Sequence, residues 1–558
     1  MGLATRPHRS LGHRPAQGRS RQGGTDRHWL RRRECRVTVS SEQTRNDFQV
    51  VVVGHGPSGA IAASLLGDRG IRTLAIDRQL EVYDKPRAIA IDHEILRLLD
   101  NLGAAERVLP YVAPFPASQH FGAKGQLIRR IDMVAEPYPL GYTPSMVFTQ
   151  PPVEAALREH AAAYDSVEVE LGTELLGFEQ STDRVTLHLR NDRGTTRAVT
   201  ADYVIACDGA SSGTRQQLGI AFEDLVFDEP WLVVDLQVSD ASLSKLPQTA
   251  AQFCDPSRPT TFIIGPGNHR RFEIMLLPGE DPREMETAAQ VWRLLARWIT
   301  PDDARLWRAA SYRFHALVAQ EWRRGRIFLA GDAAHQQPPF IGQGMCQGIR
   351  DVGNLVWKLD RVLRGQSNAK LLDSYGEERG EHVRQLTSRI KAIGHVICER
   401  DPDAAAARDE RILAEGGGHP RTITRQEIVP PLQTGLLAFP LHAAHGTLFP
   451  QPWIRTAEGR RRLDSVAGTG WRLVLDTRSE LELSPDLQAI MTQLDIRPIR
   501  IGPSADDVLT EEDGVLAAWF DRHDCRAAIV RPDHYVFGVA SETSALDALL
   551  TDLAERLR

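Results

Sequence analysis

Cysteine is scarce in this chain, and its placement excludes two common uses. The 558 residues include six cysteines, and none of them forms a CxxC pair. Scattered cysteines give no basis for a zinc site or a disulfide framework, so we expect a cytoplasmic protein that binds no metal. The sequence also lacks an apolar run long enough to cross a bilayer, so we expect no membrane association.

A basic surface is missing from most of the chain. The formal net charge is -6, but residues 1–47 carry eleven arginines and four acidic residues, which leaves the remainder at about -13. This balance argues against nucleic acid as a partner. The length allows about three domains.

Residues 1–47 lack the apolar segment of a secretion signal. Their arginine-rich, acid-poor composition predicts a disordered basic tail. A mis-assigned translation start is the alternative, with Val37 or Val39 as other starts.

The first informative motif is a glycine-rich turn between a strand and a helix. Residues 48–53 are apolar and β-branched, which predicts a buried parallel strand, and residues 60–66 continue at helical spacing. Gly54 permits a tight turn, Gly56 lets the backbone approach a pyrophosphate, and Gly59 lets helix and strand pack closely. A structural turn in an ordinary doubly wound domain is the alternative. The nucleotide contacts expected here are Val53, Gly54, Gly56, Pro57, Ser58 and Gly59.

A second predicted strand, residues 71–76, ends at Asp77 and Arg78. An acidic side chain at this distance from the glycines commonly accepts hydrogen bonds from ribose hydroxyls. We therefore predict that Asp77 and Arg78 contact the nucleotide end of the ligand.

Two further strand ends favour FAD over NAD. Residues 201–206 predict a strand that runs into Asp208, and residues 326–330 predict one that runs into Gly331 and Asp332. A nicotinamide dehydrogenase does not need them, whereas the ribityl hydroxyls of a flavin can donate to a carboxylate at such a strand end. We assign that role to Asp332, with a helix or turn cap as the alternative.

A loop rich in proline and glycine, residues 338–344, precedes a helical pattern over residues 345–363. The positive end of this helix would stabilise negative charge on a reduced flavin ring. Four residues of the junction are expected to contact the cofactor: Pro339, Gly342, Gly344 and Met345.

The segments around Gly54, Asp208 and Gly331 resemble the three motifs of the class A flavoprotein aromatic hydroxylases, the family that includes para-hydroxybenzoate hydroxylase and phenol hydroxylase. The resemblance extends from about Phe48 to the C-terminus, and within the family it points to the hydroxylases of 3-(3-hydroxyphenyl)propionate. Four segments that flavoenzymes at large do not share carry it: residues 86–92, 253–259, 270–273 and 530–533.

The resemblance implies an α/β fold of several domains. These are a Rossmann-like FAD-binding domain (residues 48–225 and 310–400), an antiparallel-sheet substrate domain (226–309), a linker (401–448) and a C-terminal thioredoxin-like domain (449–558). The last domain lacks a redox cysteine pair, because Cys525 is isolated. We therefore expect it to serve structure or oligomerisation, and a homo-oligomer stays open.

The resemblance also implies further cofactor contacts. Arg87 stands where the family has an arginine near the pyrophosphate and ribityl chain, and Gln150 where a glutamine contacts FAD. Asp208 lies in the motif used near the pyrophosphate. A surface arginine and a helix cap are the alternatives for the first two. Among the departures from the family, His55 is tolerable if its side chain points outward, and Cys346 replaces an asparagine.

The chemistry that the resemblance implies is NADH-dependent monooxygenation. Through a flavin C4a-hydroperoxide, O2 would ortho-hydroxylate a phenolic acid such as 3-(3-hydroxyphenyl)propionate in aromatic catabolism. The phenol must release its proton, and Asp92, His93 and His335 are the candidate acceptors, each with a structural role as alternative. Asp92 is favoured because the matched segment approaches the ring.

Substrate recognition is expected in the middle of the chain. Residues 231–238, 260–264 and 271–277 alternate apolar and polar residues between turns, which predicts antiparallel strands that roof the flavin. A propionate carboxylate needs a cation. The candidates are Arg258, Arg270 and Arg271.

Two other functions remain open. One is a hydroxylase of a polyketide or drug-like polycyclic phenol, because such enzymes share the three motifs. The other is a flavin-binding reductase or redox sensor without oxygenase activity.

Overall fold

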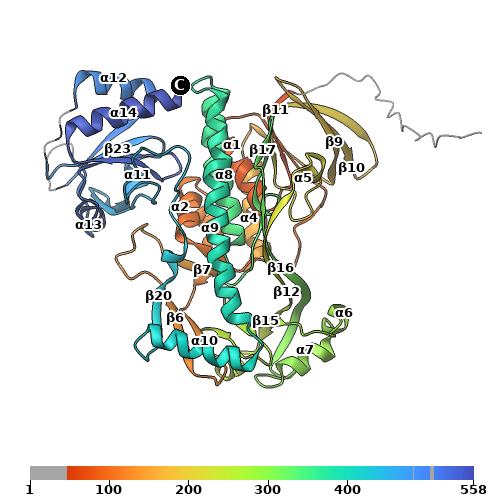
Figure 1. The fold of residues 1–558 in the computed structure, drawn as a ribbon. Coiled ribbons are helices and arrows are strands. Elements are labelled where there is room, and N and C mark those ends of the chain that lie inside the picture. The colour runs from red at the N-terminus through yellow and green to blue at the C-terminus, as the bar shows by residue number, and fades with distance from the viewer. Residues whose placement is uncertain (1–46, 480, 482, 503–507) are drawn as a thin grey trace, which may run out of the picture. The chain divides into compact units, whose positions relative to one another are not determined.

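The computed structural model describes residues 47–479, 481, 483–502 and 508–558. The prediction of a disordered tail or mis-assigned start therefore lies outside the described residues, except for Asp47. Two large sheets and a smaller C-terminal sheet organise the described chain (Figure 1). No described helix is both long and apolar enough to cross a bilayer.

The first sheet is built around parallel strands. Strand β1 (Asp47–Val53) lies between β2 (Thr73–Asp77) and β11 (Thr196–Ala206), and both pairs are parallel. The sheet continues through β8 (Val167–Leu171) on one side and β18 (Ile327–Leu329) on the other. The order is the doubly wound arrangement that the sequence predicts.

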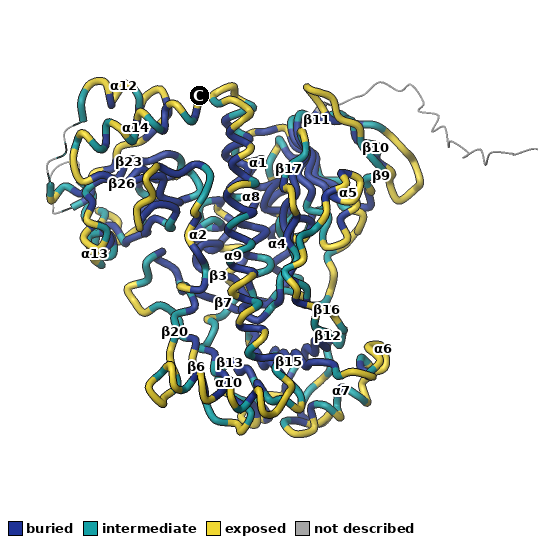
Figure 2. Tube along the Cα trace, viewed as in Figure 1, coloured by how far each residue is buried: buried dark blue, intermediate teal, exposed yellow. Residues whose placement is uncertain are grey.

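Helices cover this sheet and bury its apolar strands. Helix α1 (Pro57–Asp68) packs against α4 (Gln150–Ala162) and α8 (Gly344–Leu363). Small residues let α1 lie close to its neighbours, and it is buried from Gly59 to Gly67. In Figure 2, α1, α4 and α8 lie in the region where buried segments are concentrated.

Further elements complete this part of the chain. They are β3 (Ala90–Asp92), α2 (His93–Asn101), α3 (Ala105–Val108), β4 (Val112–Pro114), β7 (Ser145–Phe148), β9 (Thr173–Gln180), β10 (Val185–Asn191), α5 (Gly213–Gln217), β17 (Arg323–Arg324) and α9 (Asp373–Cys398). Strands β3, β7 and β4 form a small separate sheet, and α9 packs against α8.

The second sheet has nine strands in the order β19-β16-β12-β15-β14-β13-β5-β6-β20. Antiparallel pairing of β12, β15 and β14 confirms the predicted sheet. The strands are β5 (Ser118–Phe121), β6 (Leu127–Asp132), β12 (Phe222–Val238), β13 (Ala250–Phe253), β14 (Thr260–Ile264), β15 (His269–Met275), β16 (Ala304–Ala319), β19 (His335–Gln336) and β20 (Arg421–Thr424). Short helices α6 (Pro282–Met285) and α7 (Ala288–Leu295) lie between β15 and β16.

The segment predicted as a linker, residues 401–448, has structure of its own. Helix α10 (Pro402–Glu415) begins after Asp401, whose side chain accepts hydrogen bonds from two backbone N–H groups of the first turn. An aspartate cap, a proline in the first turn and a run of alanines favour this helix. Strand β20 then joins the second sheet in parallel with β6.

The C-terminal sheet has the order β24-β23-β25-β26, with the first pair parallel and the others antiparallel. Its elements are β21 (Trp453–Thr456), β22 (Gly459–Arg462), α11 (Leu463–Ala467), β23 (Arg472–Asp476), α12 (Pro485–Leu494), β24 (Arg497–Ile501), α13 (Val515–Arg522), β25 (Ala527–Val530), β26 (Val536–Ala540) and α14 (Thr543–Leu557). Cys525 is buried and free. The thioredoxin-like assignment stays a prediction.

Buried ion pairs join this C-terminal region to the helices of the first sheet. Arg531 donates to both carboxylate oxygens of Glu378 on α9, at 3.0 and 2.6 Å. Lys358 on α8 donates to the same carboxylate at 2.9 Å. A second bridge joins Arg97 on α2 to Asp464, at 2.7 and 2.8 Å. A charged side chain is stable in the interior only when it is paired. These ion pairs therefore limit how the C-terminal region can pack against the helices of the first sheet.

Candidate cofactor and substrate site

A cleft of about 1360 Å³ is lined by residues of both large sheets. Val53 and Asp77, at the ends of β1 and β2, lie on one side, and Val233 and Phe314 of the second sheet lie on the other. Ligands of open α/β sheets bind at the carboxyl ends of the strands. Predicted cofactor residues that line the cleft are Val53, Gly54, Gly56, Pro57, Ser58, Asp77, Arg78, Arg87, Gln150, Asp208, Gly331, Asp332, Pro339, Gly344 and Met345.

The three glycines of the first turn have different structural roles. Gly54 has a φ of +93°, and a Cβ there would lie 2.4 Å from the carbonyl oxygen of Cys207. A Cβ at Gly59 would lie 1.9 Å from the carbonyl oxygen of Gly54, so this position packs the helix onto the turn. A Cβ at Gly56 would meet nothing within 4 Å. Gly56 therefore leaves room at the cleft wall.

The N-terminus of α1 opens onto this room. No side chain caps the first turn, and Gly56, Pro57 and Ser58 line the cleft. The first N–H groups of a helix lack partners within the helix and carry partial positive charge. They offer a binding site for a pyrophosphate.

Asp77 shapes the turn through its carboxylate. It accepts hydrogen bonds from the backbone N–H groups of His55 and Gln79, each at 2.8 Å. An outward side chain was the condition under which the turn was expected to tolerate His55, and this condition is not met, because the residue is 0 % exposed. Neither of its ring nitrogens has a hydrogen-bond partner among the described residues, and burial lowers its pKa to about 4.

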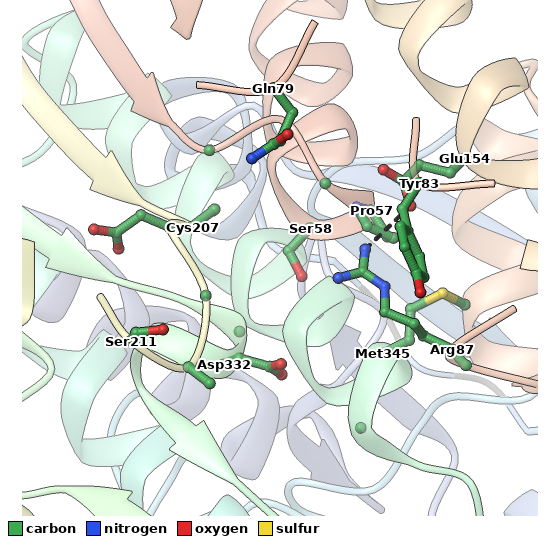
Figure 3. Close-up of a pocket in the computed structure, with 18 of the residues that line it drawn as sticks. Pro57, Ser58, Gln79, Tyr83, Arg87, Glu154, Cys207, Ser211, Asp332 and Met345 are labelled. Atoms are coloured by element: carbon green, nitrogen blue, oxygen red, sulfur yellow. Dashed lines mark ion pairs between the residues drawn. The ribbon is translucent and has the colours of Figure 1, made fainter. Parts of the chain in front are cut away.

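Gln150 fixes the segment that carries Arg87. Its side-chain oxygen accepts hydrogen bonds from the N–H groups of Arg87 and Ala88, at 3.1 and 2.6 Å. Arg87 forms an ion pair with Glu154 at 3.7 Å and is half exposed (Figure 3). In this arrangement Gln150 orients the backbone while the Arg87 guanidinium borders the cleft, where it can meet a phosphate or a flavin.

Asp208 and Asp332 lie on the cleft wall in different states. Asp208 accepts hydrogen bonds from the N–H and hydroxyl of Thr214, at 3.0 and 2.9 Å, and so holds its loop. Asp332 receives no hydrogen bond from the described residues, and it lines the cleft, as Ser58 does (Figure 3). Protein atoms around Asp332 raise its pKa by desolvation, although its side chain is open to the cleft. A free acceptor at this place fits a donor on a ligand.

The loop before α8 forms another part of the cleft wall. Pro339, Gly344 and Met345 line the cleft, and no side chain caps the start of α8. A Cβ at Gly344 would meet nothing within 4 Å. Gly342 lies outside the main cleft and faces a small inner cavity beside Ala90. The open helix end would stabilise negative charge on a ring placed against it.

The structure separates the three predicted proton acceptors. Asp92 and His93 do not line the cleft, and Asp92 is ion-paired with Arg350 in the interior. Burial lowers the pKa of His93 to about 4. His335 does line the cleft, with its Nε2 2.7 Å from Asp351. Of these three predicted acceptors, only His335 borders the cleft.

The three predicted substrate arginines are all occupied. Arg258 pairs with both oxygens of Glu280, each at 2.8 Å, and Arg270 donates to loop carbonyls. Neither lines the cleft. Arg271 does line the cleft, but it forms an ion pair with Asp235. Its Nε and Nη2 donate to the two carboxylate oxygens of Asp235 at 2.7 and 3.2 Å.

Sequence reasoning missed several residues of the roof. Glu273, Arg308 and Tyr312 line the cleft from β15 and β16. Glu273 belongs to the segment 270–273, but only the arginines of this segment were predicted to bind the substrate, because the substrate was expected to carry a carboxylate. The alternation along β15 that places Arg271 on the cleft face also places Glu273 there.

A nucleotide cradle at the ends of parallel strands, continuous with a cleft roofed by an antiparallel sheet, defines a flavin-dependent oxidoreductase. The cradle fits FAD on three observations: the space at Gly56, the uncapped start of α1 and the unpaired carboxylate of Asp332.

Comparisons with known proteins agree. The family described as FAD binding domain matches residues 47–390, and the HcaD C-terminal domain matches residues 446–556. The chain is 35% identical over 515 residues to a probable NADH-specific resorcinol 4-hydroxylase of Rhodococcus jostii (strain RHA1), covering 91% of this chain and 95% of that protein. It is 34% identical over 532 residues to a 3-(3-hydroxy-phenyl)propionate/3-hydroxycinnamic acid hydroxylase of Burkholderia cenocepacia (strain HI2424), covering 90% and 97%.

Solved structures show the same fold. The flavin-dependent monooxygenase PieE, solved with FAD and substrate, superposes with a TM-score of 0.77 at 21% identity, covering 92% of this chain and 100% of that one. The chain belongs to the FAD-dependent aromatic hydroxylases of the FAD binding domain family. The predicted family, fold class and FAD cofactor are thereby confirmed.

The role predicted for Asp332 has a direct test. We expect Asp332→Asn to weaken FAD binding about tenfold or more, because a hydrogen bond to a charged group contributes roughly 1.5–3 kcal/mol. Titration of the apoprotein with FAD, followed by flavin fluorescence, measures the change. The exposed Asp183→Asn is the control and should bind normally. Equal affinities of all three proteins would contradict the role.

Proposed function

We propose that this protein is an NADH-dependent monooxygenase that uses O2 to hydroxylate a monocyclic phenol ortho to its hydroxyl group. The compounds named for the relatives, 3-(3-hydroxyphenyl)propionate and resorcinol, are the two substrate candidates. The observation that carries the proposal is one cleft that is lined by most of the predicted cofactor residues and by residues of the second sheet. We also propose a cytoplasmic setting, where NADH is supplied.

The residues of the chain divide the work along this cleft. Bound FAD would supply the redox chemistry that links NADH to O2. The start of α1 would hold the pyrophosphate, Asp332 the ribityl hydroxyls, and the start of α8 the ring. Val233 and Phe314 line the cleft from the second sheet, and Phe314 stacks at 5.7 Å on Trp231, which is buried. This apolar wall would exclude water and hold an aromatic substrate against the ring.

Steady-state oxidation of NADH tests the proposal. We expect the FAD-loaded protein to oxidise NADH slowly alone and at least about tenfold faster with 3-(3-hydroxyphenyl)propionate or resorcinol, with a product that carries one more hydroxyl group. Stimulation by polycyclic phenols alone would instead indicate a polyketide or drug-like substrate. A lack of stimulation by every phenol would indicate a reductase or redox sensor.

A further inference from the structure

Glu273 is a buried carboxylate on the cleft face of the second sheet. It lies on β15 opposite Val233 of β12 and Thr261 of β14. The residue is 2 % exposed and lines the cleft together with Val233 and Phe314. Its carboxylate therefore adjoins the apolar wall against which an aromatic ring would lie.

This carboxylate has no partner in the described protein. Its Oε2 atom is buried without a hydrogen bond. The nearby cations are committed elsewhere, since Arg271 pairs with Asp235 at 2.7 Å and Arg308 donates to the carbonyl of Pro86 at 2.7 Å. Native proteins rarely leave a buried polar atom unpaired, so such an atom in a ligand cleft calls for a ligand donor.

Asp235 is a second buried carboxylate close to Glu273, but unlike Glu273 it is paired with cationic side chains. Burial would raise the pKa of Asp235, but Arg271 and His269 hold it down at about 2. Burial raises the pKa of Glu273 to about 7, and the opposing charge of Arg271 does not offset it. The charged groups that act on Glu273 are Arg271 on its own strand, Asp235 on β12 and Arg308 on β16.

We propose that Glu273 is the catalytic base that binds the phenol hydroxyl of the substrate and accepts its proton. This inference rests on the proposed function and names a residue for it. The phenol O–H bond breaks, the proton moves to Glu273, and the electron pair stays on the phenolate oxygen. The phenolate then activates the ring carbon, which gains one oxygen atom of O2 as the O–O bond breaks, while the other atom leaves as water with the two electrons that NADH supplies. When the ring regains aromaticity, Glu273 returns its proton to the carbonyl oxygen while the hydroxylated carbon loses its hydrogen to water.

The polar groups beside Glu273 also bear on the class of substrate. The wall that faces the ring offers an unpaired acceptor, whereas Arg271 is ion-paired with Asp235 and Arg308 already donates to a backbone carbonyl. This chemistry favours a phenol that presents a hydroxyl, as resorcinol does, rather than a carboxylate at this wall. An acid tail would have to lie elsewhere in the cleft.

Glu273→Gln provides the test, with phenol acidity as the second variable. Each variant is assayed with the phenol that the wild-type protein hydroxylates and with its ring-nitrated derivative, which is ionised near pH 8. For the first phenol we expect the hydroxylation rate to fall about 10²- to 10⁴-fold. For the nitrated phenol we expect a loss below about tenfold, because no proton remains to be removed. For each phenol, the hydroxylation rate of the variant is divided by that of the wild-type protein, which corrects for the different reactivities of the two phenols.

Glu223→Gln is the matched control on the same sheet, since Glu223 pairs with Arg384 at the surface at 2.9 Å. It should behave as wild type. Equal losses for both phenols, or no loss, would overturn the role of Glu273. If wild-type protein shows no phenol-stimulated NADH oxidation, the proposed function itself fails, which is a separate result.

Stability and wild-type pH dependence give two further checks. Ionised Glu273 is disfavoured by burial, so its folded pKa is raised and the fold gains stability as pH falls through about 7. Glu273→Gln should therefore melt no lower than wild type near pH 8, whereas a purely structural carboxylate would leave a less stable variant. In wild type, the hydroxylation rate should rise with pH to a plateau near the pKa of Glu273 for the neutral phenol only. The same acid limb with the nitrated phenol would contradict the proposal.

Discussion

Gly59→Ala is expected to abolish FAD binding and to destabilise the protein by about 3 kcal/mol. The added Cβ would lie 1.9 Å from the carbonyl oxygen of Gly54. That oxygen belongs to the backbone of the tight turn, so relief requires α1 to move away from β1. The movement displaces the N–H groups that would hold the pyrophosphate. Urea denaturation and FAD titration measure the two effects.

Gly56→Ala is the matched control for this prediction. Its Cβ would meet no protein atom within 4 Å, so the fold should keep its stability. The methyl group would enter the space assigned to the phosphates, so FAD affinity should fall without unfolding. Identical behaviour of the two variants would contradict the division of roles between the glycines.

Arg531→Met is expected to cost about 3–5 kcal/mol of stability, because it removes a buried cation and leaves two buried carboxylates, Glu378 and Asp533, with only Lys358 to balance their charge. Arg531 is 0 % exposed and donates to Glu378 and Asp533. Glu378 also pairs with Lys358 on α8, the helix whose start would face the flavin ring. The substitution should therefore lower the melting temperature and weaken FAD binding together.

Arg526→Met separates this effect from loss of an arginine in general. Arg526 is partly exposed and pairs with Asp521 at 3.2 Å, so its replacement should change stability by less than about 1 kcal/mol. Similar melting temperatures for the two variants would show that the buried network does not hold the C-terminal region against α8 and α9.

The cofactor half of the molecule could be predicted from sequence because its signals are local. The apolar run before Gly54, the carboxylate at the end of β2 and the helical pattern after the proline loop each depend on a few adjacent residues. The structure places the strands and helices there. Asp332 could be predicted for the same reason, because it comes directly after a predicted strand.

The substrate half depends on contacts that sequence does not show. Strand β20 joins the second sheet by pairing with β6, which is distant in the chain, so its segment resembles a linker. Whether an arginine is free depends on partners such as Glu280 and Asp235, which only the fold brings into reach. His55 stands between two glycines at a turn, and nothing in its local sequence shows that its side chain is fully buried.

Isotope labelling tests the account most directly. The FAD-loaded protein would be incubated with NADH, 18O2 and either 3-(3-hydroxyphenyl)propionate or resorcinol, and the product analysed by mass spectrometry. We expect a phenol with one additional hydroxyl group whose oxygen is labelled. Oxidation of NADH that yields only hydrogen peroxide, or a product whose new oxygen is unlabelled, would contradict it.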